Sequence, residues 1–453
     1  MGRWAVVPLV LMMLFSALGP GGAGSVKRPK ALPALPDVDW GHYHDYAEMA
    51  NILAELETSA PELVELISIG KSWSNNDIWA LAITNETGPR GEKKGILIVG
   101  YHHARERISL EVPLYIAWRL VSEAMTNETV ASLLGQLVFY IIPALNPDGI
   151  AVSELNPWQR KNLRPLDDDG DGLVDEDPPE DVDGDGKIYF WWNDTASGFE
   201  GVDNDGDGLI NEDWLGGVDL NRNYGFHWGD PSAVSGSPDP SDEDYRGPTA
   251  FSEPETQALR DFVLSEQTED IALAISYHSG AACVLYPWSY TSEPCPDEDK
   301  LLRLAKTYGL VAGYPYERWS TITYTCSGEW GDWMYGEVGA LSLTVELYGM
   351  HGDETWWDEH TEEVNGTYYF KDVWEYFNPP EEQIEAICAK NYRALLTTIM
   401  EFLKISAGEE ELPPTWDIAL AFLVFLMAVL VILLLLSLPG KGAAGWRRPS
   451  RFS

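Results

Sequence analysis

The sequence predicts an α/β fold in which a mixed, mainly parallel central sheet is flanked by helices. Between residues 41 and 405, segments with the 3.6-residue spacing of helices alternate with short apolar runs typical of buried strands. A length of 453 residues would accommodate one large domain or two or three average ones. The alternation continues through most of the chain and is interrupted by one acidic block, so we expect a single α/β domain with an insertion at residues 167–213.

The individual elements follow from this alternation. Helical spacing covers residues 46–59, 109–126 and 381–405. Apolar runs of strand length lie at residues 63–69, 77–84, 95–100, 138–144, 271–277 and 340–347. The sequence Leu145-Asn-Pro-Asp-Gly149 follows the fourth of these runs and predicts a turn.

Both ends of the chain carry apolar segments outside this domain. Residues 1–24 have a short apolar run behind Arg3 and then small residues, which indicates a signal peptide. After an acidic, Pro-bearing linker at 406–417, residues 418–438 hold no charge and are long enough to span a bilayer. The tail at 439–453 is basic and is therefore expected in the cytoplasm. We expect a single-pass protein of the cell membrane with its large domain outside, tethered by a C-terminal transmembrane helix.

The charge balance is strongly acidic, with 72 Asp and Glu residues against 30 Lys and Arg and a net charge of -42. Nucleic acid is excluded as a partner because phosphate binding requires a basic face. Four cysteines allow three disulfide pairings, and free buried thiols are equally compatible with the sequence.

The acidic block at residues 167–213 contains a repeat. Two copies begin at Asp167 and Asp203, a partial copy begins at Asp181, and each alternates carboxylates before a Gly turn. This pattern matches the first half of an EF-hand calcium loop but lacks its terminal carboxylate, so it predicts compact calcium repeats. A solvated, disordered acidic loop is the alternative. The candidate calcium ligands are Asp167, Asp169, Asp171, Asp175, Asp177, Asp181, Asp183, Asp185, Asp203, Asp205, Asp207 and Asp213.

A metal site is indicated by His103 and Glu106, which follow the apolar run at 95–100. Zinc accepts nitrogen and oxygen ligands, and a catalytic zinc site needs three of them, with the fourth position left for water. The third candidate is His278, at the end of the apolar run 271–277. Such a His-x-x-Glu motif also arises by chance, as a surface histidine beside a helix-start glutamate.

A base is available in Glu346, a single carboxylate inside the apolar run 340–347. A buried acid is costly unless it has a partner or a chemical task. Beside a metal-bound water it can accept a proton, whereas the alternative is a strand-edge glutamate paired with Lys or Arg.

Over residues 41–405 the chain resembles zinc metallocarboxypeptidases of the carboxypeptidase A superfamily, with a carboxypeptidase T-like character. Short pieces occur in the order of that family: His103-Ala-Arg-Glu106, Asn146-Pro-Asp-Gly149, Trp158-Gln-Arg160-Lys-Asn162, Gly217-Val-Asp-Leu-Asn221-Arg222-Asn, Tyr277-His278-Ser279, Tyr324-Thr-Cys-Ser-Gly328 and Thr344-Val-Glu346.

This resemblance implies a role for each matching residue. His103, Glu106 and His278 would hold one zinc ion, with His102 as a neighbour. Glu346 would deprotonate the zinc-bound water and later protonate the leaving amine, while Arg160 would stabilise the oxyanion. The substrate contacts implied are Asn221 and Arg222 to the terminal carboxylate, Tyr324 closing over the peptide, and Arg105 at the penultimate region.

The sequence departs from the family at the pocket for the terminal side chain. Gly331 stands at the usual selecting position and leaves space without charge, and Glu329 lies two residues before it. This combination predicts broad or basic-leaning specificity, and the alternative is that Glu329 pairs elsewhere. The function expected is zinc-dependent removal of C-terminal residues from peptides and proteins with a free C-terminus. The alternatives are hydrolysis of cell-wall peptides or isopeptides on the same scaffold, and calcium-dependent binding without catalysis.

Overall fold

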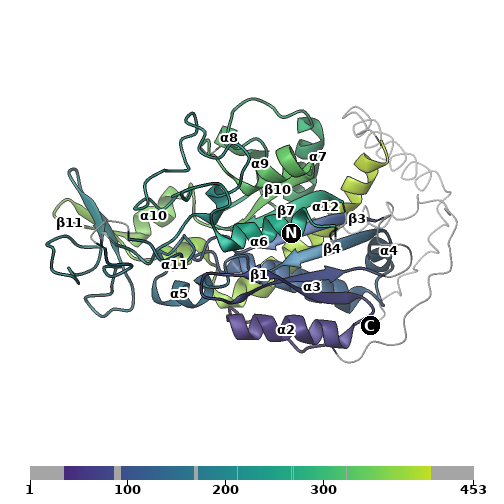
Figure 1. Ribbon diagram of the computed structural model, residues 1–453, viewed down its shortest axis with the longest axis horizontal. Coiled ribbons are helices and arrows are strands. Elements are labelled where there is room, and N and C mark those ends of the chain that lie inside the picture. The colour runs from purple at the N-terminus through teal and green to yellow at the C-terminus, as the bar shows by residue number, and fades with distance from the viewer. Residues whose placement is uncertain are drawn as a thin grey trace, which may run out of the picture. The chain divides into compact units, whose positions relative to one another are not determined.

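The centre of the molecule is an eight-stranded sheet (Figure 1). The computed structural model describes residues 35–85, 93–167, 172–211, 213–266, 268, 270–322 and 324–409. Strand order in the sheet is β1-β2-β4-β3-β7-β10-β8-β9. Four pairs of neighbours are parallel (β4–β3, β3–β7, β7–β10 and β8–β9) and three are antiparallel, which confirms a mixed, mainly parallel sheet. The strands are β1 (Val64–Lys71), β2 (Asp77–Ile83), β3 (Lys94–Gly100), β4 (Leu137–Ile142), β7 (Ile271–His278), β8 (Ala281–Tyr286), β9 (Tyr316–Arg318) and β10 (Leu341–Tyr348).

Helices cover both faces of this sheet. In β3, Leu97 and Val99 belong to a core cluster with residues of α6 and α9, whereas Ile96 and Ile98 point to the opposite face, where α3 packs. Burial on both faces explains why the central strands are continuous apolar runs. The α-helices are α2 (Tyr46–Ser59), α3 (Ile108–Glu123), α4 (Glu128–Gln136), α5 (Gly149–Leu155), α6 (Pro254–Val263), α7 (Glu298–Ala312), α8 (Trp319–Ile322), α9 (Trp330–Trp333), α10 (Glu354–His360), α11 (Val373–Phe377) and α12 (Ile384–Ser406). Single turns of 3₁₀-helix (Leu220–Arg222 and Glu381–Gln383) and one π-helix (Met334–Val338) complete the helical elements.

A second, four-stranded antiparallel sheet joins the acidic insertion to a distant part of the chain. Its order is β11-β12-β5-β6, and Figure 1 shows it beside α10, at the left of the view. Aromatic side chains of this sheet pack around Trp158 and around Phe377 of α11. The insertion is therefore packed against the main domain. Its strands are β5 (Phe190–Trp192), β6 (Ser197–Phe199), β11 (Thr361–Val364) and β12 (Thr367–Phe370).

The prediction of a transmembrane helix, and with it the single-pass location in the cell membrane, is corrected. No helix in the described residues is both long and apolar enough to cross a membrane. The longest, α12, has 23 residues but carries charges along its length, from Glu385 and Lys390 to Glu401 and Lys404, so it is amphipathic. The segment 418–438, from which the prediction came, lies outside the described residues, as does the expected signal peptide at 1–24.

The four cysteines, Cys283, Cys295, Cys326 and Cys388, are all within the described residues and are free, buried thiols.

Candidate active site

Neighbouring strands bring the predicted site residues to one edge of the sheet. Parallel pairing sets Gly100, at the end of β3, beside Tyr277 in β7. The loop after β3 then carries His103 and Glu106 toward His278, the last residue of β7. On the other side of β7, Glu346 in β10 is directly in register with His278. Residues separated by more than 200 positions in the chain thus converge because their strands end together.

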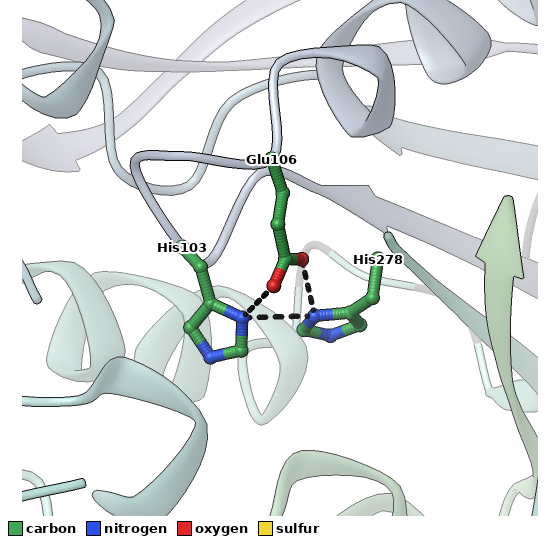
Figure 2. Close-up of side chains that lie close together, drawn as sticks. All are labelled: His103, Glu106 and His278. Atoms are coloured by element: carbon green, nitrogen blue, oxygen red, sulfur yellow. Dashed lines mark hydrogen bonds and ion pairs between the residues drawn. The ribbon is translucent and has the colours of Figure 1, made fainter. Parts of the chain in front are cut away.

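His103, Glu106 and His278 form a tight, buried group (Figure 2). The Glu106 carboxylate lies 2.7 Å from His103 Nδ1 and 3.1 Å from His278 Nδ1, and the two Nδ1 atoms are 3.3 Å apart. Burial alone would raise the pKa of Glu106, but the two histidines hold it well below its usual range. Two ring nitrogens and a carboxylate converging on one point match the donor set and spacing of a tetrahedral zinc site with one open position.

The outer nitrogens of both histidines are fixed by further hydrogen bonds. His103 Nε2 lies 3.1 Å from Asp219 Oδ1, and His278 Nε2 lies 3.0 Å from Ser276 Oγ. Such bonds orient ligand rings and leave the inner nitrogens unprotonated for a metal. Asp219 also accepts from Arg160, at 2.9 Å from Nε and 2.8 Å from Nη2, and therefore links the histidine to the guanidinium. Sequence reasoning quoted Asp219 within a motif but gave it no role, and it missed Ser276.

His102 lies next to this group but does not join it. Its ring stacks on that of His278 at 5.1 Å between centroids, and its Nε2 lies 3.0 Å from the Tyr224 hydroxyl. Burial and the neighbouring histidines hold the pKa of His102 well below its usual value, so the ring is neutral near pH 7.

A cavity of about 220 Å³ opens in front of the group. Among the described residues, no hydrogen-bonding partner reaches Glu346 Oε2, although this atom is buried. Burial and repulsion from Glu106 raise the pKa of Glu346 to about 7. The carboxyl group is therefore placed and tuned to exchange a proton near neutral pH. The predicted residues that line this cavity are His103, Arg105, Glu106, Arg160, Arg222, His278, Tyr324 and Glu346.

Two guanidinium groups give the cavity a cationic side. Arg222 is buried, donating from Nε to Ser235 Oγ (2.9 Å) and from Nη1 to the Asn221 carbonyl (2.8 Å). Although Asn221 accepts from the backbone N–H of Trp330 (3.0 Å), its buried Nδ2 has no hydrogen-bond acceptor among the described residues. The second guanidinium, that of Arg160, is held by Asp219, and its Nη1 lies 3.9 Å from Glu106 Oε1. Fixed cations of this kind suit a carboxylate ligand.

Tyr324 and Arg105 lie at the margin of the same cavity. Tyr324 is 48% exposed. Arg105 is clamped on three sides: it donates to the Trp158 carbonyl, contacts both carboxylate oxygens of Glu243 at 3.1 and 3.2 Å, and stacks 4.4 Å from the ring of Phe377.

Glu329 and Gly331 are not among the cavity-lining residues; they lie at the start of α9. Glu329 is only 2% exposed, and its carboxylate accepts from the backbone N–H of Asp332 at 2.9 Å and lies 3.4 Å from Thr344 Oγ1. A Cβ atom at Gly331 would meet Glu329 Oε2 at 3.0 Å. The carboxylate thus occupies the space toward which a side chain at position 331 would project. Burial and the charge of Glu329 raise the pKa of Asp332 to about 7.

The acidic repeats adopt one common turn. In each copy the first aspartate accepts from the backbone N–H of the glycine five residues later, at 3.1, 2.8 and 3.1 Å. Carboxylate oxygens of Asp203, Asp205 and Asp207 lie within 4.8 Å of one another, and so do those of Asp181, Asp183 and Glu200. Glu200 was not predicted. The three hydrogen bonds join Asp167 to Gly172, Asp181 to Gly186 and Asp203 to Gly208.

The remaining acidic residues connect these turns to their surroundings. Asp177, in the copy that begins at Asp167, accepts from the backbone N–H groups of Asn204 and Asn211 in the copy that begins at Asp203. Its backbone also pairs with that of Asp213. Asp175 accepts from Gly216 N at 2.6 Å. Asp183 and Asp185 pair with Lys371, while Asp169 and Asp171 lie outside the described residues.

Comparison with known proteins agrees with this geometry. Residues 49–394 match the zinc carboxypeptidase family, and the chain belongs to that family. Carboxypeptidase B of Astacus astacus is 30% identical over 319 residues, which are 68% of this chain and 88% of that protein. Carboxypeptidase A from Helicoverpa armigera has the same fold, with a TM-score of 0.59 at 20% identity over 80% of this chain and 74% of that one. The structure of bovine thrombin-activatable fibrinolysis inhibitor, solved with a tick carboxypeptidase inhibitor, matches with a TM-score of 0.56 at 22% identity. The match covers 81% of this chain and 99% of that one. The protein is thus a zinc-dependent peptide hydrolase with a metallocarboxypeptidase activity.

Proposed function

We propose that this enzyme removes single residues from the free C-terminus of peptides and proteins, with zinc held by His103, Glu106 and His278. The observation that carries the proposal is the position of Arg222. It is buried beside Asn221, and it lines the same cavity as the three ligands and Glu346. A carboxylate bound there places the last peptide bond, and not an internal one, next to the ligands.

The side chains divide the reaction among them. Zinc, when bound, polarises the scissile carbonyl and increases the acidity of water. Glu346 Oε2 takes a proton from the attacking water and returns it to the leaving nitrogen, for which its pKa near 7 is suited. Arg160, fixed by Asp219, faces the carbonyl oxygen as negative charge develops on it. Tyr324, exposed at the margin, covers the bound residue, and Arg105 contacts the preceding one.

The test is hydrolysis of an N-blocked dipeptide by the purified chain. We expect turnover that is abolished by a zinc chelator and restored by added zinc, and a loss of kcat of at least about 100-fold in Glu346→Gln. Equal turnover by Glu346→Gln, or unchanged turnover in a protein that contains no zinc, would contradict the proposal.

We further propose a preference for a basic C-terminal residue. Support comes from the Glu329 carboxylate, which lies in the space in front of Gly331 with the Asp332 N–H and the Thr344 hydroxyl as polar neighbours. An ammonium or guanidinium group reaching this point would form a charge-assisted hydrogen bond. A cell-wall peptide is an alternative substrate for the same residues, since Asn221 and Arg222 require only a free α-carboxylate.

For the acidic insertion we propose structural calcium at the turns that begin with Asp181 and Asp203. Clustered carboxylates repel one another, and calcium takes six to eight oxygen ligands of this kind. We expect the melting temperature of the zinc-loaded chain to rise by several degrees in excess calcium, since a ligand at 100 times its Kd stabilises a fold by about 2.7 kcal/mol. The same measurement on Asp205→Asn is the control. An unchanged melting temperature in calcium and in a calcium chelator would refute this role.

A further inference from the structure

A second cavity, of about 300 Å³, lies between the acidic insertion and the main domain. Three aromatic rings, two from the insertion and one from Trp214 directly after it, form its apolar part: Phe199 packs edge-on against Trp214, with ring centroids 4.6 Å apart, and lies 4.9 Å from Phe190. Ile210 adds an aliphatic side chain that is 56% exposed. The opposite wall comes from the main domain, through Lys161 and Glu243. The polar side chains of Ser197, Asn211 and Ser241 complete the lining, so the cavity has an apolar part beside a polar one and a volume in the range of ligand sites.

This second cavity adjoins the catalytic one. Glu243, in its wall, contacts Arg105 with both carboxylate oxygens, and Arg105 lines the catalytic cavity. Lys161 follows directly after Arg160, which also lines the catalytic cavity. If the terminal carboxylate is bound at Arg222 and the preceding residue at Arg105, as proposed above, the upstream part of a bound peptide would continue toward the second cavity.

We propose that the second cavity binds a large apolar side chain of the peptide substrate, upstream of the scissile bond. This inference rests on the proposed exopeptidase function. The three rings and Ile210 suit an apolar occupant, and both charged side chains of the lining already have partners: Lys161 donates to the Pro240 carbonyl and Glu243 is paired with Arg105. An aromatic or aliphatic side chain would cover the exposed face of Ile210 and pack on the three rings, which removes apolar surface from water. The insertion would then extend the substrate-binding surface of the enzyme.

The test compares hexapeptides that share one C-terminal dipeptide. Phe is placed in turn at the third, fourth or fifth residue from the C-terminus, with Gly at the other positions. For the wild-type enzyme we expect kcat/KM to rise about tenfold at one of these positions relative to the all-Gly peptide. Ile210→Ala should reduce that preference at least threefold. Leu209→Ala is the matched control, since Leu209 is equally exposed (57%) and does not line the cavity.

A second readout separates this inference from the exopeptidase function. Binding of the Phe and all-Gly hexapeptides to Glu346→Gln is measured by calorimetry. If the blocked dipeptide is not hydrolysed but the Phe peptide still binds more tightly, and Ile210→Ala removes the difference, the proposed function fails and the second cavity stands. Equal kcat/KM and equal binding for Phe and Gly peptides at every position, or identical losses in Ile210→Ala and Leu209→Ala, would overturn the inference.

Discussion

Replacing Asp219 by Asn tests whether one buried carboxylate supports both the metal and the guanidinium. Asp219 is fully buried, with one oxygen 3.1 Å from His103 Nε2 and the other bonded to Arg160. Asparagine keeps one acceptor oxygen, but its amide N–H groups face either the imidazole N–H or the guanidinium. Loss of such a bond behind a metal ligand lowers metal affinity or activity by about 10–100-fold. Misplacing Arg160 should lower kcat by about 100-fold even when zinc is saturating.

The assay has two parts. Zinc affinity is measured by competition with a coloured chelator, and kcat is measured on the blocked dipeptide with zinc in excess. Asp148→Asn is the control, because Asp148 is also buried and accepts from Ser72, Ser74 and Asn76, but lies outside the cavity. Both variants should lose stability, and only Asp219→Asn should lose zinc affinity. A zinc affinity of Asp219→Asn within about twofold of the wild type would refute the reasoning.

Two further predictions concern buried carboxylates. Glu329→Gln keeps an acceptor for the Asp332 N–H and removes the charge, so kcat/KM for peptides ending in Lys or Arg should fall about 10–100-fold while those ending in Leu change little. An unaltered Lys-to-Leu ratio would count against a role for Glu329 in specificity. Burial and the neighbouring Glu253 raise the pKa of Glu255 from 4.5 to about 8, so its protonated form is favoured in the fold. The stability this contributes is complete below about pH 4.5 and is lost as the pH rises through about 8. Denaturant titrations should show a decline of about 4 kcal/mol relative to Glu255→Gln between pH 5 and 9, and parallel profiles for the two proteins would contradict it.

The sequence predicted well those elements whose position is determined by one local physical cause, such as burial on both faces or helix capping. The run at 95–100 is apolar at every residue because β3 is buried on both faces, and the helix at 46–59 has the predicted bounds of α2, where Asp45 and Glu48 form a capping box. Strand ends then bring His103, Glu106, His278 and Glu346 together, although their motifs lie far apart in the chain.

Other features depend on partners that are distant in the chain. Strands β5 and β12 are three and four residues long and are stabilised by each other and by aromatic packing, so no local periodicity marks them. Asp219 and Ser276 are recognisable only once His103 and His278 are seen to need orienting groups. The position of the Glu329 carboxylate in front of Gly331 depends on the backbone path at the start of α9, which local sequence does not reveal.

The central claim, that a free C-terminus is required, is tested by comparing one peptide as its free acid and as its C-terminal amide. Mass spectrometry of a timed digest should show the free acid shortened one residue at a time from the C-terminus, and the amide left intact by comparison, because Arg222 and Asn221 then have no carboxylate to bind. Internal cleavage, or equal rates on the acid and the amide, would contradict the account.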